Sequence, residues 1–262
     1  MEIIVLIKQV PDIEKVKFDA EKGRIDRSSA PAETNPFDLN ALEAAIQLKE
    51  KLGGSITVLS MGPKQVESSL RDALARGADK AILLTDDRFA GADTLATAYT
   101  LATAIKKLGR FDLIICGEKT VDGDTGQVGP EVAEFLGIPH VAYVSEIREV
   151  HQDKLLLISD MGDKYLVEVK LPALITVTKD LNTPRLPSLR NVLRARKKEI
   201  EIWDADALSD YGDLDGFGVK GSKTMVVKVV IPSEKGRKGI IFRGEDAVER
   251  LLEVLRENGL VS

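Results

Sequence analysis

The stretch LIICGEKTVDGDTGQVGPEVAEFLG, residues 113–137, contains one complete strand–loop–helix unit. Leu113–Cys116 is an apolar run typical of a buried strand, and Val128–Leu136 has a helical pattern that Gly137 ends. The long loop between them is rich in glycine, aspartate, threonine and glutamine, so it offers a bare backbone and many hydrogen-bonding groups. The unit predicts an α/β fold and raises the question of what the loop binds.

The same alternation runs through the preceding residues. Further strands are predicted at Ile3–Ile7, Ser55–Ser60 and Ala81–Leu84, and further helices at Asp38–Leu52, Val66–Arg76 and Asp93–Leu108. This regular spacing implies right-handed crossovers and a buried, mainly parallel sheet. We therefore expect a doubly wound α/β fold of the adenine-nucleotide-binding type, with a strand order near 3-2-1-4-5.

An open sheet of this kind binds ligands beyond the carboxyl ends of its strands, at the point where the strand order reverses. In the order 3-2-1-4-5 that point lies between the first and the fourth strand. The loops that face the crevice are then Lys8–Asp12 and Gly117–Gln127. A ligand is therefore predicted at the loop of residues 117–127.

The pattern changes at Glu146. Three short strands predict an antiparallel β addition and precede a further buried strand; the four are Glu146–Val150, Leu155–Asp160, Tyr165–Lys170 and Leu171–Val177. A basic helix follows two prolines, and the chain beyond Glu199 becomes irregular before a strand-like stretch, Met225–Ile231, and a helix, Glu245–Asn258. We expect an α/β nucleotide-binding unit in residues 1–200 and a C-terminal arm with a helix in residues 201–262.

Composition excludes several classes of function. The net charge of −5 disfavours nucleic acid as the main partner, because such proteins usually carry a positive field. The single cysteine, Cys116, excludes an intrachain disulfide, and two histidines are too few for a convincing metal site. No run approaches the length of a membrane span, and the start MEIIVLIKQVPD is typical of a first strand, not of a signal peptide. The expected setting is cytoplasmic, without membrane insertion.

The loop itself has two interpretations. Gly123, Gly126 and Gly129 would let the backbone approach a ligand, and the first amides of the following helix suit phosphate. Thr125 and Gln127 add donors, while Asp122 and Asp124 suit ribose hydroxyls. The alternative is a turn that only caps the helix, since Asp, Thr and Gly are ordinary there. The length and position of the loop favour ligand binding.

Other candidate residues also have structural explanations. Asn35-Pro36 would start a turn, Asp38 would cap the helix that follows, with Phe37 as a hydrophobic staple, and Asp93 would cap the helix of residues 93–108. GFGVKG at 216–221 has dinucleotide-fingerprint spacing but no preceding strand and no following helix, so we reject it as a dinucleotide-binding motif.

Cys116 is expected to be a buried thiol. The basic patch is explained equally by a solvated helix face and by docking to an acidic protein; it comprises Arg185, Arg190, Arg194, Arg196, Lys197 and Lys198.

Catalytic machinery is missing from the sequence. We find no set of nucleophile, base and acid, no metal cluster and no isolated carboxylate pair. A binding crevice without such side chains either holds a nucleotide structurally or leaves the chemistry to a cofactor.

Several segments together resemble the beta subunit of electron-transfer flavoprotein. They cover most of residues 1–200 in the family's order, and they are VLIKQVPD, NPFDLNALEAAIQLKE, VLSMGPKQVESSLRDALARGADKAILL, DGDTGQVGP, VEVKLPALITV and LNTPRLPSLRNVLRARKK. The resemblance implies a heterodimer with an alpha subunit, which residues 201–262 would clasp. It implies an electron carrier in which a flavin performs the redox chemistry, so whether the chain is an enzyme stays open.

The family has two branches with different cofactors. In the ordinary branch the beta subunit holds AMP as a structural nucleotide. In the bifurcating branch it holds FAD instead, which oxidises NADH and splits the electrons between a high-potential acceptor flavoprotein and ferredoxin or flavodoxin. The short loop VDGDTGQVGP, together with KQVPD and GADTLATA, resembles the bifurcating branch, so FAD is favoured over AMP.

The resemblance also assigns residues. The nucleotide contacts would be Leu6, Asn35, Pro36, Phe37, Asp38, Met61, Gly117, Val121, Asp122, Gly123, Asp124, Thr125, Gly126, Gln127 and Val128. The flavin ring would be bordered by Lys8, Gln9, Val10 and Pro11, with Asp93, Thr94 and Thr97 helping to hold the cofactor.

A second surface is implied for redox partners. Residues 184–191 resemble the loop that docks a dehydrogenase or quinone oxidoreductase, and its members would be Pro184, Arg185, Leu186, Leu189 and Arg190. Leu189 stands at the family's anchoring leucine, and Arg190 stands where many members have proline. Two rival interpretations are a stand-alone adenine-nucleotide-binding protein and a docking subunit with an empty crevice.

Overall fold

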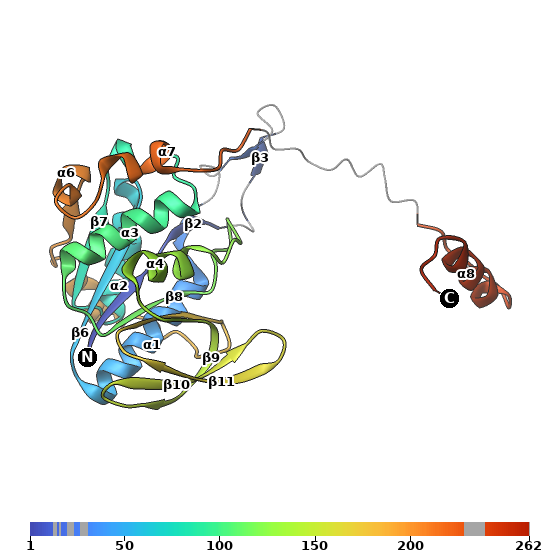
Figure 1. Ribbon diagram of the computed structural model, residues 1–262, viewed down its shortest axis with the longest axis horizontal. Helices are drawn as coiled ribbons and strands as arrows, with labels where there is room; N and C mark the ends of the chain where they lie inside the picture. Colours follow the sequence, from blue (N-terminus) through green and yellow to red (C-terminus); the bar gives the residue numbers. More distant parts are fainter. Residues whose placement is uncertain (13–14, 16, 20–23, 27–30, 228–238, 262) are drawn as a thin grey trace.

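The computed structural model describes residues 1–262 except 13–14, 16, 20–23, 27–30, 228–238 and 262. Within the described residues, nine strands form one sheet in the order β11-β10-β9-β12-β8-β1-β6-β7-β13 (Figure 1). The parallel part contains β7, β6, β1, β8 and β12 in that order, which is 3-2-1-4-5 when these strands are numbered along the chain. The predicted fold class and strand order are confirmed.

Short runs of branched aliphatic residues form the parallel strands. These are β1 (Glu2–Leu6), β6 (Ser55–Met61), β7 (Lys80–Leu84), β8 (Leu113–Gly117) and β12 (Ala173–Val177). All residues of β12 are buried, as are residues 3–6 of β1, because helices cover both faces of the sheet. Val5 of β1 lies between Val58 of β6 and Ile115 of β8, which fixes the register at the centre of the sheet.

Helices lie on both faces. The core on one face is built with α1 (Pro36–Leu52), α2 (Glu67–Arg76) and the short α5 (Leu189–Ala195). The core on the other face is built with α3 (Thr94–Leu108), α4 (Val128–Leu136) and α6 (Ala205–Leu208). This arrangement places α1 and α4 beside the carboxyl end of β8, on opposite sides of the sheet (Figure 1).

The antiparallel addition continues the same sheet. It consists of β9 (His140–Val150), β10 (Lys154–Asp160) and β11 (Lys164–Lys170). β9 begins six residues before the predicted start at Glu146, and it pairs in parallel with β12 before it pairs antiparallel with β10. The meander therefore extends the sheet beyond its parallel part.

The chain beyond Glu199 is more ordered than the sequence predicted. β13 (Glu201–Trp203) pairs in parallel with β7, and α6, η4 (Leu214–Gly216) and α7 (Gly218–Gly221) pack near α3. Phe217 is 1% exposed and meets Phe89 edge-on, with ring centroids 5.3 Å apart. The expectation of an irregular stretch is wrong for residues 201–221, and the division after residue 200 stays a prediction.

Smaller elements complete the described chain. β2 (Gln9–Pro11) pairs with β5 (Ala32–Thr34), and β3 (Lys17–Asp19) pairs with β4 (Arg24–Asp26). Two 3₁₀ turns, η2 (Lys64–Val66) and η3 (Asp87–Phe89), follow β6 and β7. The strand-like stretch Met225–Ile231 is only partly described, and residues 225–227 form no regular structure.

The last helix, α8 (Ala247–Glu257), has no buried residue and stands apart from the sheet and its helices (Figure 1). Val248 and Leu251 on this helix are 65% and 44% exposed. Among the described residues, no helix combines the length and apolar character that crossing a bilayer requires.

Candidate functional site

The two loops predicted to face the crevice meet at the carboxyl ends of β1 and β8. Lys8 follows β1 and Asp122 lies in the loop after β8, and the Lys8 ammonium bonds both carboxylate oxygens of Asp122 at 2.8 and 2.9 Å. The side chain of Asp122 is only 6% exposed, whereas that of Lys8 is 45% exposed. The strand order thus brings together residues 114 positions apart, as the switch-point argument predicted.

Asn35 holds both loops from beneath. This residue is fully buried, and its amide nitrogen donates to the carbonyl of Lys119 at 2.9 Å. Its side-chain oxygen accepts from the Val121 amide at 3.2 Å, while its own backbone amide donates to the Lys8 carbonyl at 2.9 Å. All three contacts fix backbone, so Asn35 positions the crevice loops through its side chain and its main chain.

Asp38 performs a similar task one helical turn later. Its carboxylate accepts from the amides of Lys8 at 2.8 Å and Gly117 at 3.0 Å, and the residue is 4% exposed. Burial raises the pKa of Asp38 to about 7, against the opposing effect of these hydrogen bonds. The prediction that Asp38 caps α1 is wrong: the helix already begins at Pro36, which leaves the Asp38 carboxylate free to bind the neighbouring loops.

Gly117 makes this arrangement possible. A Cβ at this position would lie 2.6 Å from both Asp38 Oδ1 and the Cβ of Phe37. The end of β8 can therefore approach the start of α1 only without a side chain. The contact of Gly117 with a nucleotide stays a prediction.

The loop after β8 leads to an open helix start. Gln127 occupies the N-cap position of α4, but its side chain makes no capping hydrogen bond. Gly123, Asp124, Thr125 and Gln127 are exposed. The alternative interpretation, a turn that merely caps α4, requires a capping side chain, and Gln127 does not act as one. The first amides of α4 are therefore not capped by this residue and stay suited to an anion.

Glu131, in the first turn of α4, is a residue that the sequence analysis missed. Thr94 Oγ1 donates to Glu131 Oε1 at 3.3 Å and lies 3.2 Å from Gln127 Oε1. Glu131 Oε2 is buried and has no hydrogen-bond partner among the described residues, and burial raises the pKa of this carboxyl group. An orphaned acceptor at this place suits a hydroxyl donor. No local pattern distinguished it from an ordinary helical glutamate.

Gly129 serves packing. A Cβ there would lie 2.6 Å from Thr176 Cγ2 and 3.0 Å from Cys116 Sγ, so the glycine lets α4 pack closely on the sheet. A side chain at this position would face the core, and the approach of the Gly129 backbone to a ligand stays a prediction. Cys116 is buried as predicted, and burial raises the pKa of its thiol.

Asp93 caps α3 as predicted, with Ala96 donating to Oδ1 at 3.0 Å. Its other oxygen accepts from the backbone amides of Lys223 and Thr224 and from Thr224 Oγ1, at 2.8 to 3.0 Å. Burial opposes ionisation, but the hydrogen bonds prevail and lower the pKa of Asp93 to about 2. This carboxylate therefore fastens the segment that leads to the C-terminal residues, a role that the sequence did not indicate.

The remaining predicted cofactor contacts differ in how exposed they are. The side chains of Leu6, Val10 and Pro11 are buried, whereas Pro36 is exposed and Phe37, Met61, Thr97, Val121 and Val128 are partly exposed. Gln9 donates to Ser68 Oγ at 2.8 Å, and Lys119 lies 5.9 Å from the Phe37 ring centroid. Their contact with a cofactor stays a prediction. Among the described residues, no group of three or more His, Cys, Asp or Glu side chains is arranged as a metal site.

The predicted docking loop is anchored by one arginine. Arg185 binds Glu43, which is 5% exposed, and Glu50, with nitrogen to oxygen distances of 2.8 and 2.5 Å. Arg76 Nη1 donates to the Arg185 carbonyl at 2.6 Å. Arg185 is therefore a support of the loop, while Leu186 and Leu189 are 86% and 75% exposed.

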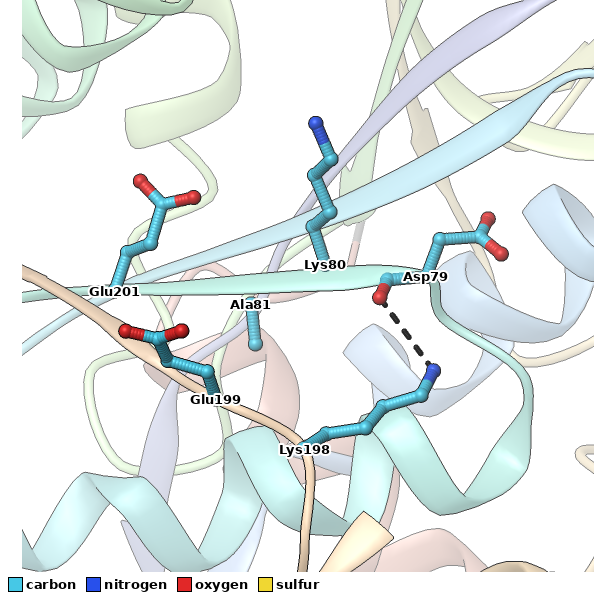
Figure 2. A pocket seen from close by; sticks show the side chains of 6 residues that line it. All are labelled: Asp79, Lys80, Ala81, Lys198, Glu199 and Glu201. Atoms are coloured by element: carbon cyan, nitrogen blue, oxygen red, sulfur yellow. Dashed lines mark hydrogen bonds between the residues drawn. The ribbon is translucent and has the colours of Figure 1, made fainter. Parts of the chain in front are cut away.

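A small pocket lies elsewhere, between the amino end of β7 and the segment before β13. Its lining residues are Asp79, Lys80, Ala81, Lys198, Glu199 and Glu201 (Figure 2). Lys198 Nζ bonds the Asp79 carbonyl at 3.4 Å and the Ala78 carbonyl at 2.9 Å. The pocket lies at the opposite end of the strands from the crevice, where folds of this type do not bind their ligands.

Comparison with known proteins agrees with this geometry. The model of the electron transfer flavoprotein domain matches residues 22–208. The chain belongs to the electron transfer flavoprotein family. It resembles the beta subunit of the electron transfer flavoprotein of Thermoanaerobacterium thermosaccharolyticum, with 48% identity over 100% of both chains. The corresponding subunit of Clostridium acetobutylicum is 47% identical over 98% of each chain.

A third relative of this flavoprotein family is subunit CarD of the caffeyl-CoA reductase-Etf complex of Acetobacterium woodii. It is 42% identical over 90% of each chain. The resemblance to electron transfer flavoprotein beta subunits is thus confirmed over the whole chain, including the C-terminal residues that carried little signal by themselves.

Proposed function

We propose that this chain is an electron transfer flavoprotein beta subunit that holds FAD in the crevice between β1 and β8. One observation carries the proposal: Asn35 and Asp38 lock the two crevice loops beside the open start of α4, at the switch point of a sheet of this family. Such a locked backbone is preorganised for a diphosphate, because its amides need not move when the anion binds.

The residues present fit an adenine nucleotide. Gly126 has φ of +64° and offers bare backbone in the loop, and the first turn of α4 offers amides to phosphate oxygens. The orphaned Glu131 Oε2 suits a hydroxyl donor, such as a sugar or ribityl hydroxyl, better than it suits phosphate. Thr94 and Thr125 supply further hydroxyl groups nearby.

FAD, when bound, supplies the redox chemistry, since no side chain of the described site is arranged as an acid–base or nucleophilic catalyst. The chain's own residues bind, orient and shield. Lys8 is half-exposed at the mouth of the crevice, and its ammonium, although paired with Asp122, would have a further N–H to donate to a ring or phosphate oxygen. We infer that the protein belongs to the bifurcating branch, with NADH as donor and an acceptor flavoprotein and ferredoxin or flavodoxin as acceptors.

An alpha subunit is the proposed obligate partner. The exposed apolar residues of α8 and of residues 225–227 supply surface for it, since Met225, Val226 and Val227 are 78 to 88% exposed. The docking loop presents Leu186 and Leu189 to a dehydrogenase. The name of the A. woodii relative, which joins a CoA reductase to an Etf, supports an association of this kind.

The test is to co-express the chain with its alpha subunit, denature the purified complex and count its nucleotides. Two flavins per heterodimer are expected. One flavin and one AMP would overturn bifurcation and assign the crevice to structural AMP. A chain that binds ATP or AMP tightly without an alpha subunit or flavin absorbance would instead be a stand-alone nucleotide-binding protein.

A further inference from the structure

Tyr143 has a backbone conformation that a bulky residue rarely adopts. Its φ is +55°, in the left-handed region, although it lies within strand β9. The pairing of β9 with β12 gains an extra residue here, because Val141 opposes Ile175 while Val144 opposes Val177. Tyr143 therefore sits in a β-bulge, a device that turns a side chain toward a new direction.

The surrounding structure holds this strained residue in place. Thr176, 2% exposed, accepts the Tyr143 amide at 3.1 Å through its hydroxyl, and Ser159 Oγ donates to the Ala142 carbonyl at 2.7 Å. Thr176 also lies directly beneath Gly129 at the start of α4. The bulge is thus built against the same helix start that borders the crevice.

The bulge directs the tyrosine ring toward the crevice loop. Tyr143 Oη lies 3.5 Å from the position that a Cβ of Gly126 would take, and the residue is 37% exposed. A strand residue without the bulge would alternate between the faces of the sheet and have no reason to meet this loop. Gly126 contributes the space, and Tyr143 places a hydroxyl there.

We propose that Tyr143 is a further ligand-binding residue, whose hydroxyl donates a hydrogen bond to a phosphate oxygen held by the loop of residues 122–128. The inference rests on the proposed nucleotide site and adds a side-chain donor to the backbone amides. A phenol hydroxyl donates one directional hydrogen bond and carries no charge. It would therefore select the position of a phosphate oxygen without changing the net charge of the site. Strain of this kind persists at binding sites because the surrounding structure supports it.

The experiment titrates the complex with the alpha subunit, after removal of its bound nucleotide, with ADP and, separately, with adenosine, which lacks phosphate. Tyr143→Phe removes only the hydroxyl, and we expect it to weaken ADP binding about 3- to 10-fold while adenosine binding stays unchanged. Tyr143→Gly should weaken ADP binding at least as much without lowering Tm, because glycine adopts positive φ without strain. Tyr165→Phe, at a half-exposed tyrosine of β11, is the matched control and should bind both compounds as the wild type does.

Unchanged ADP affinity in Tyr143→Phe would overturn the inference and leave the proposed function intact. Equal losses of ADP and adenosine affinity would also overturn it, since the hydroxyl would not then act on phosphate. A wild-type complex that bound neither compound would overturn the proposed nucleotide site, and this inference with it.

Discussion

The carboxylate of Asp38, in the first turn of α1, accepts a hydrogen bond from the backbone amide of Gly117, 79 positions further along the chain, at 3.0 Å. The same carboxylate accepts the Lys8 amide at 2.8 Å. One buried side chain thus joins the ends of β1 and β8, the two strands that flank the switch point. The spacing of the loops that follow these strands therefore depends on a residue that need not touch a ligand.

Asp38→Ala should destabilise the protein and reduce its nucleotide content. The substitution leaves the amides of Lys8 and Gly117 without their acceptor, at a cost of about 1–3 kcal/mol for each buried group. We expect the free energy of unfolding to fall by about 3 kcal/mol in urea titrations, with a loss of bound nucleotide. Asp87→Ala, at an exposed carboxylate, is the control and should change neither quantity.

Asp38 should also give stability a distinctive pH dependence. Burial raises its pKa from 3.8 to about 7 in the folded chain. Between these values the folded state binds the proton more tightly than the unfolded state does. The contribution of Asp38 to the free energy of unfolding is therefore full below pH 3.8 and is lost as the pH rises through 7.

Urea titrations between pH 4.5 and 8 check this, with Asp38→Asn as the variant that cannot titrate. The wild-type free energy of unfolding should fall more steeply across this range than that of Asp38→Asn. Lys8, whose charge lies nearby, is present in both proteins, so it does not account for a difference in slope. Parallel pH profiles would contradict the assignment.

The regular elements were predictable because periodicity is a local signal. The helix Val128–Leu136 and the order of the five parallel strands follow from runs of apolar residues and from the handedness of crossovers. β13 was missed because Glu201–Trp203 is too short to show alternation and gains its order from pairing with β7.

The site was predictable in position and less so in detail. Strand order placed the two crevice loops together, but the local sequence around Asn35 and Asp38 is equally typical of a helix cap. The partners of their side chains lie 30 to 86 positions away in the chain, and no short pattern encodes such hydrogen bonds. The bulge at Tyr143 is likewise set by β12 and Thr176, outside its own strand.

Gly126→Val should release the nucleotide. The residue has φ of +64°, and a side chain would enter the space between the Glu118 carbonyl and Tyr143, where the backbone is proposed to approach phosphate. We expect nucleotide content, measured by chromatography of the denatured complex, to fall at least about tenfold, as a loss of about 1.4 kcal/mol or more would produce.

Gly137→Val separates this effect from backbone strain. Gly137 has nearly the same φ, +65°, but a side chain there meets nothing within 4 Å, and it lies at the far end of α4. In both variants the left-handed backbone conformation of the new valine costs about 1–2 kcal/mol of folding free energy. Equal nucleotide loss in the two variants would show that strain, and not obstruction of the site, is responsible.

Asp93→Ala should release the start of the C-terminal segment. It removes the cap of α3, worth about 1 kcal/mol, and the acceptor for the amides of Lys223 and Thr224. Hydrogen exchange at these two amides should become faster. Asp204→Ala, which removes the cap of the short helix α6, is the control and should leave exchange at 223 and 224 unchanged.

Leu189 and Arg185 should affect redox docking in different ways. Leu189 is 75% exposed, so Leu189→Ala should slow electron transfer to the partner dehydrogenase without changing stability or nucleotide content.

Arg185→Ala leaves the buried carboxylate of Glu43 without its cation, so it should lower the free energy of unfolding by about 1–2 kcal/mol and slow the same reaction. Arg185→Lys should fall between Arg185→Ala and the wild type, since it keeps the charge but loses the planar fork that binds two carboxylates. Stopped-flow reduction with the dehydrogenase measures the rate, and Leu193→Ala, a half-exposed leucine on the same helix, serves as the control. A normal rate in Leu189→Ala would contradict docking through this loop, whereas a normal rate in Arg185→Ala alone would mean that the loop keeps its shape without the anchor.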